Sequence, residues 1–147
     1  MLFTLSTDKT LSETAADLNA AVQANHFGVM HIHNLKETMT KQGVAFGPEC
    51  LIFEVCQPQQ AKKVLDGNMS LSTVLPCRIS LYEKGGRTIL ATLKPTALLA
   101  MFDTHPPESV AQDVEATIIK IITEAATPRV AAMGLSASSG AGINAAD

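Results

Sequence analysis

Two cysteines stand in similar surroundings in this chain, and thiols combine nucleophilic, redox and soft-metal chemistry. Cys56 lies in "EVCQPQQ" and Cys77 in "VLPCRIS", each close to a proline at the edge of an apolar run. A helix that begins at Pro58 would place its N-terminus beside Cys56, where the helix dipole stabilises a thiolate. The pair is therefore a candidate site for a transition metal or a sulfur species, and we expect the two sulfurs to approach each other.

Buried structural thiols are the alternative, because unpaired cysteine is among the residue types most often buried. The spacing of the two cysteines is too wide for the Cys-x-x-Cys motif of redox and zinc sites. Alternation along the apolar segment 50–56 puts Cys56 on the face of Glu54. Along the segment that follows Pro76, Cys77 shares its face with Ile79. The two sulfurs then point to different sides of a sheet unless a bulge or a strand end intervenes.

Two histidines form a second candidate site. His31 and His33 alternate with apolar residues in "VMHIH", so both imidazoles leave the same face of one strand. This placement suits two ligands of one transition metal, and Glu54, Cys56 or Cys77 could supply a third across the sheet. Two histidines on a solvent-facing strand would show the same pattern.

Catalysis has no positive support in the sequence. Glu54 and Glu83 lie in otherwise apolar segments, where a carboxylate with a raised pKa could be a general base. Pairing with Arg78 or Arg87 would explain them equally well. We find no Ser-His-Asp set, phosphate-binding glycine loop or pair of acids with a common site. We therefore lean against an enzyme.

Composition limits the classes of partner. The chain has 147 residues, which suits one domain with a real core, and its net charge is −3 without any basic run. Nucleic acid is an unsuitable partner, because phosphate binding needs clustered cations and only 4% of the residues are aromatic. Lys, Glu or Thr interrupts the longest apolar stretches well before the ~18 residues that span a membrane.

Localisation is expected to be cytoplasmic. No signal peptide is visible in "MLFTLSTDKT", although a mature chain that has lost one would look the same. Three cysteines form an odd set, which fits a reducing compartment better than a disulfide scaffold.

Periodicity and turn residues predict an α+β fold. Strands are expected at residues 2–6, 26–33 and 50–56 and in a hairpin over 77–93 that turns at Gly85 and Gly86. Helices are expected from the Thr10 capping box to Ala24, after Asn34, from Pro58 to Gly67 and from Pro95. This order predicts a mainly antiparallel sheet of about five strands with helices on one face.

The strongest helical periodicity comes last in the chain. Apolar residues recur at helical spacing at Val110, Val114, Thr117, Ile118, Ile121, Ile122 and Ala125. Pro128 ends this pattern, and the segment after it consists largely of Ala, Gly and Ser. We therefore expect one α+β domain over residues 1–127 and a small-residue tail over 128–147.

Several motifs taken together resemble a known family. They are Phe27-Gly28-Val29, Cys56-x-Pro58 with Ala61 and Leu65, Leu75-Pro76-Cys77, Tyr82-Glu83 before the glycine turn, and Pro95 after the hairpin. With them, residues 25–102 resemble the family catalogued as domain of unknown function 302. The resemblance implies a fold similar to the TATA-binding-protein-like group, in which a curved antiparallel sheet grips a long helix. It also implies dimers, and it carries no established activity.

We therefore predict a homodimeric, non-catalytic ligand-binding domain. The preferred ligand is a transition metal or sulfur species at Cys56 and Cys77. The alternative is an apolar small molecule in a cavity lined by Met30, Ile32 and the last helix. A single layer of helices leaves one sheet face uncovered, and a second copy of the chain is the simplest cover.

Overall fold

The computed structural model describes residues 1–103 and 107–129, and these contain a five-stranded sheet. Its strands are β1 (Leu2–Thr7), β2 (Gly28–Asn34), β3 (Cys50–Cys56), β4 (Cys77–Lys84) and β5 (Arg87–Leu93). They lie in the order β1-β5-β4-β3-β2, and every neighbouring pair is antiparallel. The predicted α+β fold with a five-stranded antiparallel sheet is confirmed.

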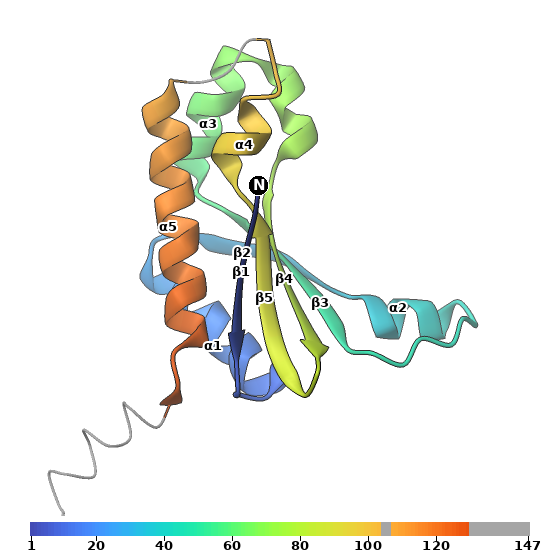
Figure 1. Ribbon diagram of the computed structural model, residues 1–147. Helices are drawn as coiled ribbons and strands as arrows, with labels where there is room; N and C mark the ends of the chain where they lie inside the picture. The colour runs from blue at the N-terminus through green and yellow to red at the C-terminus, as the bar shows by residue number, and fades with distance from the viewer. Residues whose placement is uncertain (104–106, 130–147) are drawn as a thin grey trace, which may run out of the picture.

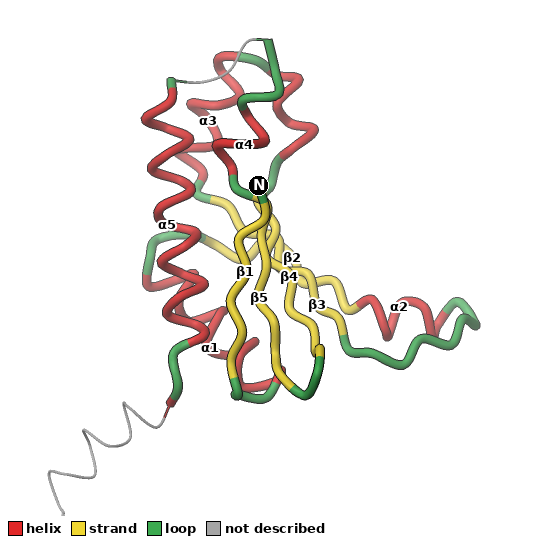
Figure 2. Tube along the Cα trace, in the orientation of Figure 1, coloured by secondary structure: helices red, strands yellow, loops and turns green. Residues whose placement is uncertain are grey.

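The helices occupy three places around this sheet. They are α1 (Leu11–Ala24), α2 (Leu35–Lys41), α3 (Pro58–Gly67), the 3₁₀ helix η1 (Met69–Val74), α4 (Pro95–Leu99) and α5 (Glu108–Ala126). Figure 1 shows α5 running along one side of the sheet beside α1, whereas α2 projects away on an arm. Helices α3, η1 and α4 gather where β3 and β5 end and β1 and β4 begin (Figure 2). This helical end of the sheet holds the candidate site.

Local sequence signals set the element boundaries as expected. The Thr10 hydroxyl accepts a hydrogen bond from the Glu13 N–H at 3.1 Å, and the Glu13 carboxylate accepts one from the Thr10 N–H at 3.1 Å. This is the predicted capping box at the start of α1. Gly85 and Gly86 form the β4–β5 turn with φ values of 61° and 77°, a region that favours glycine.

The apolar stripe of α5 packs into the main core. Ile118, Ile121 and Ile122 are all 0% exposed. They form one cluster with Leu18, Val22, Phe53, Val55, Ile79, Leu81 and Leu90. Val114, which was also expected in this core, is only partly buried, because it lies at the cavity described below. The long C-terminal helix is confirmed.

Charged residues fasten the two ends of the described chain together. The Lys9 ammonium donates to the carbonyl oxygens of Ala125 at 2.7 Å and Thr127 at 2.8 Å, at the end of α5, and lies 2.6 Å from Asp17. A cation at this end offsets the negative pole of the helix dipole. Arg129 forms a second ion pair with Asp17 at 3.0 Å, and its hydrogen bond holds the pKa of that carboxyl below its usual value. From residue 130 on, the predicted tail lies outside the described residues.

The sheet face opposite α1 and α5 carries mixed side chains. By strand register it presents half-buried Ile52, Tyr82 and Ile89 beside polar Ser80 and Glu54. We call this surface the open face. Among the described residues, no helix combines the length and apolar composition needed to cross a membrane.

Candidate functional site

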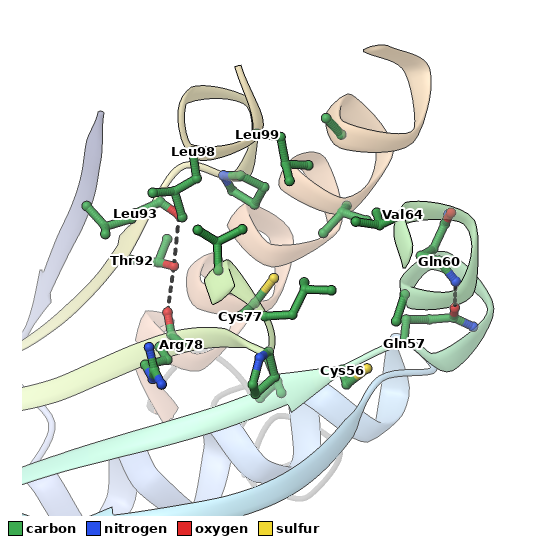
Figure 3. Close-up of a pocket in the computed structure, with 18 of the residues that line it drawn as sticks. Cys56, Gln57, Gln60, Val64, Cys77, Arg78, Thr92, Leu93, Leu98 and Leu99 are labelled. Atoms are coloured by element: carbon green, nitrogen blue, oxygen red, sulfur yellow. Dashed lines mark hydrogen bonds between the residues drawn. The ribbon is translucent and has the colours of Figure 1, made fainter. Parts of the chain in front are cut away.

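A cavity of about 320 Å³ lies at the helical end of the sheet (Figure 3). Strand ends supply Val55, Cys56, Cys77 and Thr92 to its lining. The helices supply Gln60, Val64, Leu98, Leu99, Val110 and Val114, among others. The lining is therefore mainly apolar, with a few polar groups.

Long-range contacts hold the helical wall of this cavity. Val64, Leu71, Leu99, Val110 and Ala111 form a small second core that joins α3, η1, α4 and α5. In addition, the Glu115 carboxylate of α5 accepts hydrogen bonds from the Thr96 N–H at 3.1 Å and the Thr96 hydroxyl at 2.6 Å. These bonds give the free backbone N–H at the start of α4 an acceptor and hold α4 against α5.

Cys56 and Cys77 both line the cavity. Cys77 pairs with Val55, so it lies on the helix-covered face, and Cys56 comes one position later as the last residue of β3. The sequence analysis expected the two sulfurs on different sides of the sheet unless a bulge or a strand end intervened. Here the end of β3 intervenes, so both residues line the same cavity. Figure 3 shows that the two side chains do not point at each other: that of Cys77 points up toward the helices, and that of Cys56 lies below Gln57.

Burial controls the ionisation of both thiols. It raises the pKa of Cys77 to about 11, and the charge on Cys56 contributes to the rise. Burial also raises the pKa of Cys56, although the N-terminus of α3 lies beside it. The low dielectric of the buried site disfavours the charged thiolate. Both groups are therefore protonated near neutral pH.

Alkylation of Cys77 should show this directly. Only the thiolate reacts, so its rate with iodoacetamide should rise about tenfold per pH unit and level off only near the pKa of about 11. Peptide mapping by mass spectrometry separates Cys77 from Cys50 and Cys56. A Cys77→Ser variant should lose this step alone. Reaction at pH 7 as fast as that of a free thiol would contradict the prediction.

The structure brings His31, His33 and Glu54 together on the open face. The ring centroids of the two histidines are 4.4 Å apart, and the His33 Nε2 lies 3.2 Å from the Glu54 Oε2. The same oxygen lies 3.5 Å from the Arg78 guanidinium. The hydrogen bond from His33 is the main cause that lowers the pKa of Glu54. This carboxylate is thus occupied by two partners of its own chain.

These histidines and the two cysteines do not form one site. Cys77 lies on the helix-covered face, opposite the open face that carries His33. Within residues 1–103 and 107–129, no group of three or more His, Cys, Asp or Glu side chains is arranged to hold a metal ion.

Met30 and Ile32 do not line the cavity, which corrects the lining expected from the sequence. They are 62% and 42% exposed on the edge strand β2. Met30 instead borders a shallow hollow beside α3, together with Cys56 and Leu65. The expected contribution of the last helix is present, through Val110, Ala111 and Val114.

Gln60 and Leu98 are site residues that the sequence analysis missed. A signal for Gln60 was available, because α3 begins at Pro58 and a polar residue at 57 caps it: the Gln57 Oε1 accepts from the Gln60 N–H at 2.7 Å. Gln60, in the first turn of this helix, lines the cavity. No signal in the sequence marks Leu98 as a cavity residue.

The fold and the cavity define an α+β domain with a mainly apolar cavity at the end of an antiparallel sheet. The chain belongs to the family described as Domain of unknown function DUF302, whose model matches residues 3–125. The assignment expected from the cysteine and proline motifs is confirmed, over a longer part of the chain.

A solved structure supports the same assignment. The chain is similar to the crystal structure of an uncharacterized conserved protein DUF302 from Bacillus stearothermophilus, with 28% sequence identity and a TM-score of 0.78. The similarity covers 84% of this chain and 97% of the other. No curated protein matches the chain.

Proposed function

We propose that the protein binds a small, mainly apolar molecule in the cavity at the helical end of the sheet. The observation that carries the proposal is the cavity itself, whose volume of about 320 Å³ falls within the roughly 300–1,000 Å³ of ligand sites. Its lining is mainly aliphatic, so burial of an apolar ligand would be favourable.

The charges around the cavity favour an uncharged ligand. Arg78 is the one charged residue among the described lining residues. Its side chain is 59% exposed and lies beside Glu54, so its charge is already solvated and partly paired. The Cys77 thiol is neutral near pH 7, because its pKa is about 11. An ionised group would lose its hydration in this cavity without gaining a buried counter-charge.

The proposal contains no catalytic step. Burial keeps both cavity thiols in the protonated form, which is a poor nucleophile. The Thr92 hydroxyl donates to the Arg78 carbonyl oxygen at 2.7 Å, so it is held by the backbone. These observations favour binding over chemistry at this site.

A direct titration tests the proposal. A cavity of about 150 Å³ is known to bind benzene, so a bicyclic aromatic probe suits this larger one. We expect saturable binding of 2-methylnaphthalene at one molecule per chain, followed by its fluorescence. Absence of saturable binding, with the protein folded by circular dichroism, would contradict the proposal.

The second candidate is the soft ligand at Cys56 and Cys77, a transition metal or a sulfur species. It is favoured by one observation: both thiols line one cavity, and the charge of Cys56 raises the pKa of Cys77. Metal binding would have to release both thiol protons against the effect of burial.

Elemental analysis separates the two candidates. Protein purified without added metal should contain none under the first proposal. Stoichiometric metal that a Cys56→Ser/Cys77→Ser variant loses would establish the second candidate instead. Metal that survives this change and disappears in a His31→Ala/His33→Ala variant would place it on the open face.

We also propose a homodimer that forms through the open face or a sheet edge. The half-buried side chains of Ile52, Tyr82 and Ile89 support an association there. Light scattering at micromolar concentration should give twice the chain mass of 15.5 kDa, and Tyr82→Glu should shift it toward a monomer. A wild-type monomer would count against the proposal.

We propose a cytoplasmic location because the cysteines are unpaired. Cys50, Cys56 and Cys77 are all free. Unpaired thiols of this kind persist in a reducing compartment.

A further inference from the structure

The cavity at the helical end of the sheet is open on one side, where apolar lining residues face solvent. Leu2 and Leu93 both line the cavity, yet they are 60% and 44% exposed. They lie opposite each other on β1 and β5. We call these two leucines the mouth of the cavity. The inner wall differs from the mouth, because its aliphatic residues Val64, Leu99 and Val110 are buried.

The mouth lies where the sheet opens between β4 and β5. The register of these two strands ends at the pair Ser80 and Ala91. Beyond this pair, β4 extends to Cys77 along β3, and β5 extends to Leu93 along β1. Ser80 belongs to the open face and Cys77 to the helix-covered face, and both line the cavity. The cavity therefore reaches from the helices to the open face between the two strand ends.

A side-chain hydrogen bond crosses this opening. The Thr92 hydroxyl of β5 donates to the Arg78 carbonyl oxygen of β4 at 2.7 Å (Figure 3). The bond ties the two strand ends together beyond their last register pair. The opening beside it is thus held by the strands themselves.

Exposed leucines at the mouth bear on the shape of the ligand. A compact molecule among the helices would leave Leu2 and Leu93 in water. A longer molecule that fills the inner cavity and continues through the mouth would also cover them, and covering apolar surface is favourable.

We propose that the ligand of this cavity carries a long, flexible hydrocarbon chain. The inner part of the chain lies among the helices, and the outer part passes between β4 and β5 onto Leu93 and Leu2. The inference rests on the proposed function and specifies its ligand class: an uncharged alkyl-chain molecule instead of a compact ring system.

A series of straight-chain alcohols tests this inference. 1-Hexanol, 1-octanol and 1-decanol are uncharged and differ only in chain length. Their affinities, measured by competition with 2-methylnaphthalene, should rise about fourfold for each added methylene group, the effect of burying that group. Affinities that level off after 1-hexanol, although 2-methylnaphthalene binds, would overturn the inference and leave the proposed function standing.

Substitutions at the mouth should act only on the longer chains. Leu2→Asn/Leu93→Asn replaces both leucines with polar side chains of similar shape. It should lower the ratio of the 1-decanol affinity to the 1-hexanol affinity about tenfold, because the outer methylene groups lose their apolar cover. Ile32 is 42% exposed on β2 and is absent from the described lining, so Ile32→Asn should leave the ratio unchanged. An unchanged ratio in the double variant would contradict the inference.

A fluorescent reporter at the mouth gives an independent readout. The chain contains no tryptophan, so Leu93→Trp introduces a single one there. Saturating 1-decanol should shift its emission to shorter wavelength, because the chain covers the ring, whereas 1-hexanol should leave the emission in place. Absence of a shift with saturating 1-decanol would also overturn the inference. If the wild-type protein binds neither the alcohols nor 2-methylnaphthalene, the proposed function itself has failed.

Discussion

Replacing Ile118 with alanine should lower the free energy of unfolding by about 2–5 kcal/mol. The side chain is 0% exposed and packs in the main core, where α5 meets α1 and the sheet. Truncation loses the burial of the removed carbons and leaves a cavity that the surrounding side chains fill only partly. Total stabilities of domains are roughly 5–15 kcal/mol, so the loss is a large share.

A neighbouring isoleucine provides the control. Ile119 follows directly on α5 but is only partly buried, so Ile119→Ala should cost clearly less. Chemical denaturation gives the difference, and thermal melts at two protein concentrations show where it arises. A loss that depends on protein concentration would mean that α5 stabilises an association of chains. An unchanged melting temperature for Ile118→Ala would show that α5 is misplaced.

Filling the cavity should abolish binding of an apolar probe. Ala111 is 5% exposed and lines the cavity from α5. An Ala111→Phe variant would place an aromatic ring in the space that the probe needs, so the apolar burial that drives binding is lost. We expect affinity for 2-methylnaphthalene to fall about a hundredfold or more, which corresponds to about 2.7 kcal/mol.

A stability measurement and a surface variant serve as controls for this prediction. Ala111 also belongs to the small second core, so the larger side chain should cost about 1–3 kcal/mol of stability, and circular dichroism must show that the variant is still folded. Ala116 is exposed on the same helix, so Ala116→Phe should alter neither binding nor melting. Undiminished binding by a folded Ala111→Phe protein would mean that the probe binds elsewhere.

Most of the elements could be predicted from the sequence because their signals are local. The Thr10–Glu13 capping box sets the start of α1 within four residues, and the two glycines of the β4–β5 turn supply positive φ values that other residues avoid. The periodicity of α5 identifies its buried side, since side chains three and four residues apart share a helix face.

The positions of Met30 and Ile32 could not be predicted from such local signals. Alternation tells which side chains of a strand share a face, and it does so without reference to what covers that face. Only the strand order shows that β2 is an edge strand, so that both side chains are exposed and lie outside the cavity.

The cavity depends on contacts between distant segments. The pairing of Val55 with Cys77 brings the end of β3 to the start of β4, and this register places both cysteines at one space. Burial raises the pKa of Cys77 to about 11, and it also raises the pKa of Cys56, against the local expectation of a thiolate beside the N-terminus of α3. Residue types and helix starts are thus determined locally by the sequence. The ionisation of the thiols, the cavity lining and the burial of the Gln60 side-chain oxygen arise only from the tertiary packing, which excludes water from these groups.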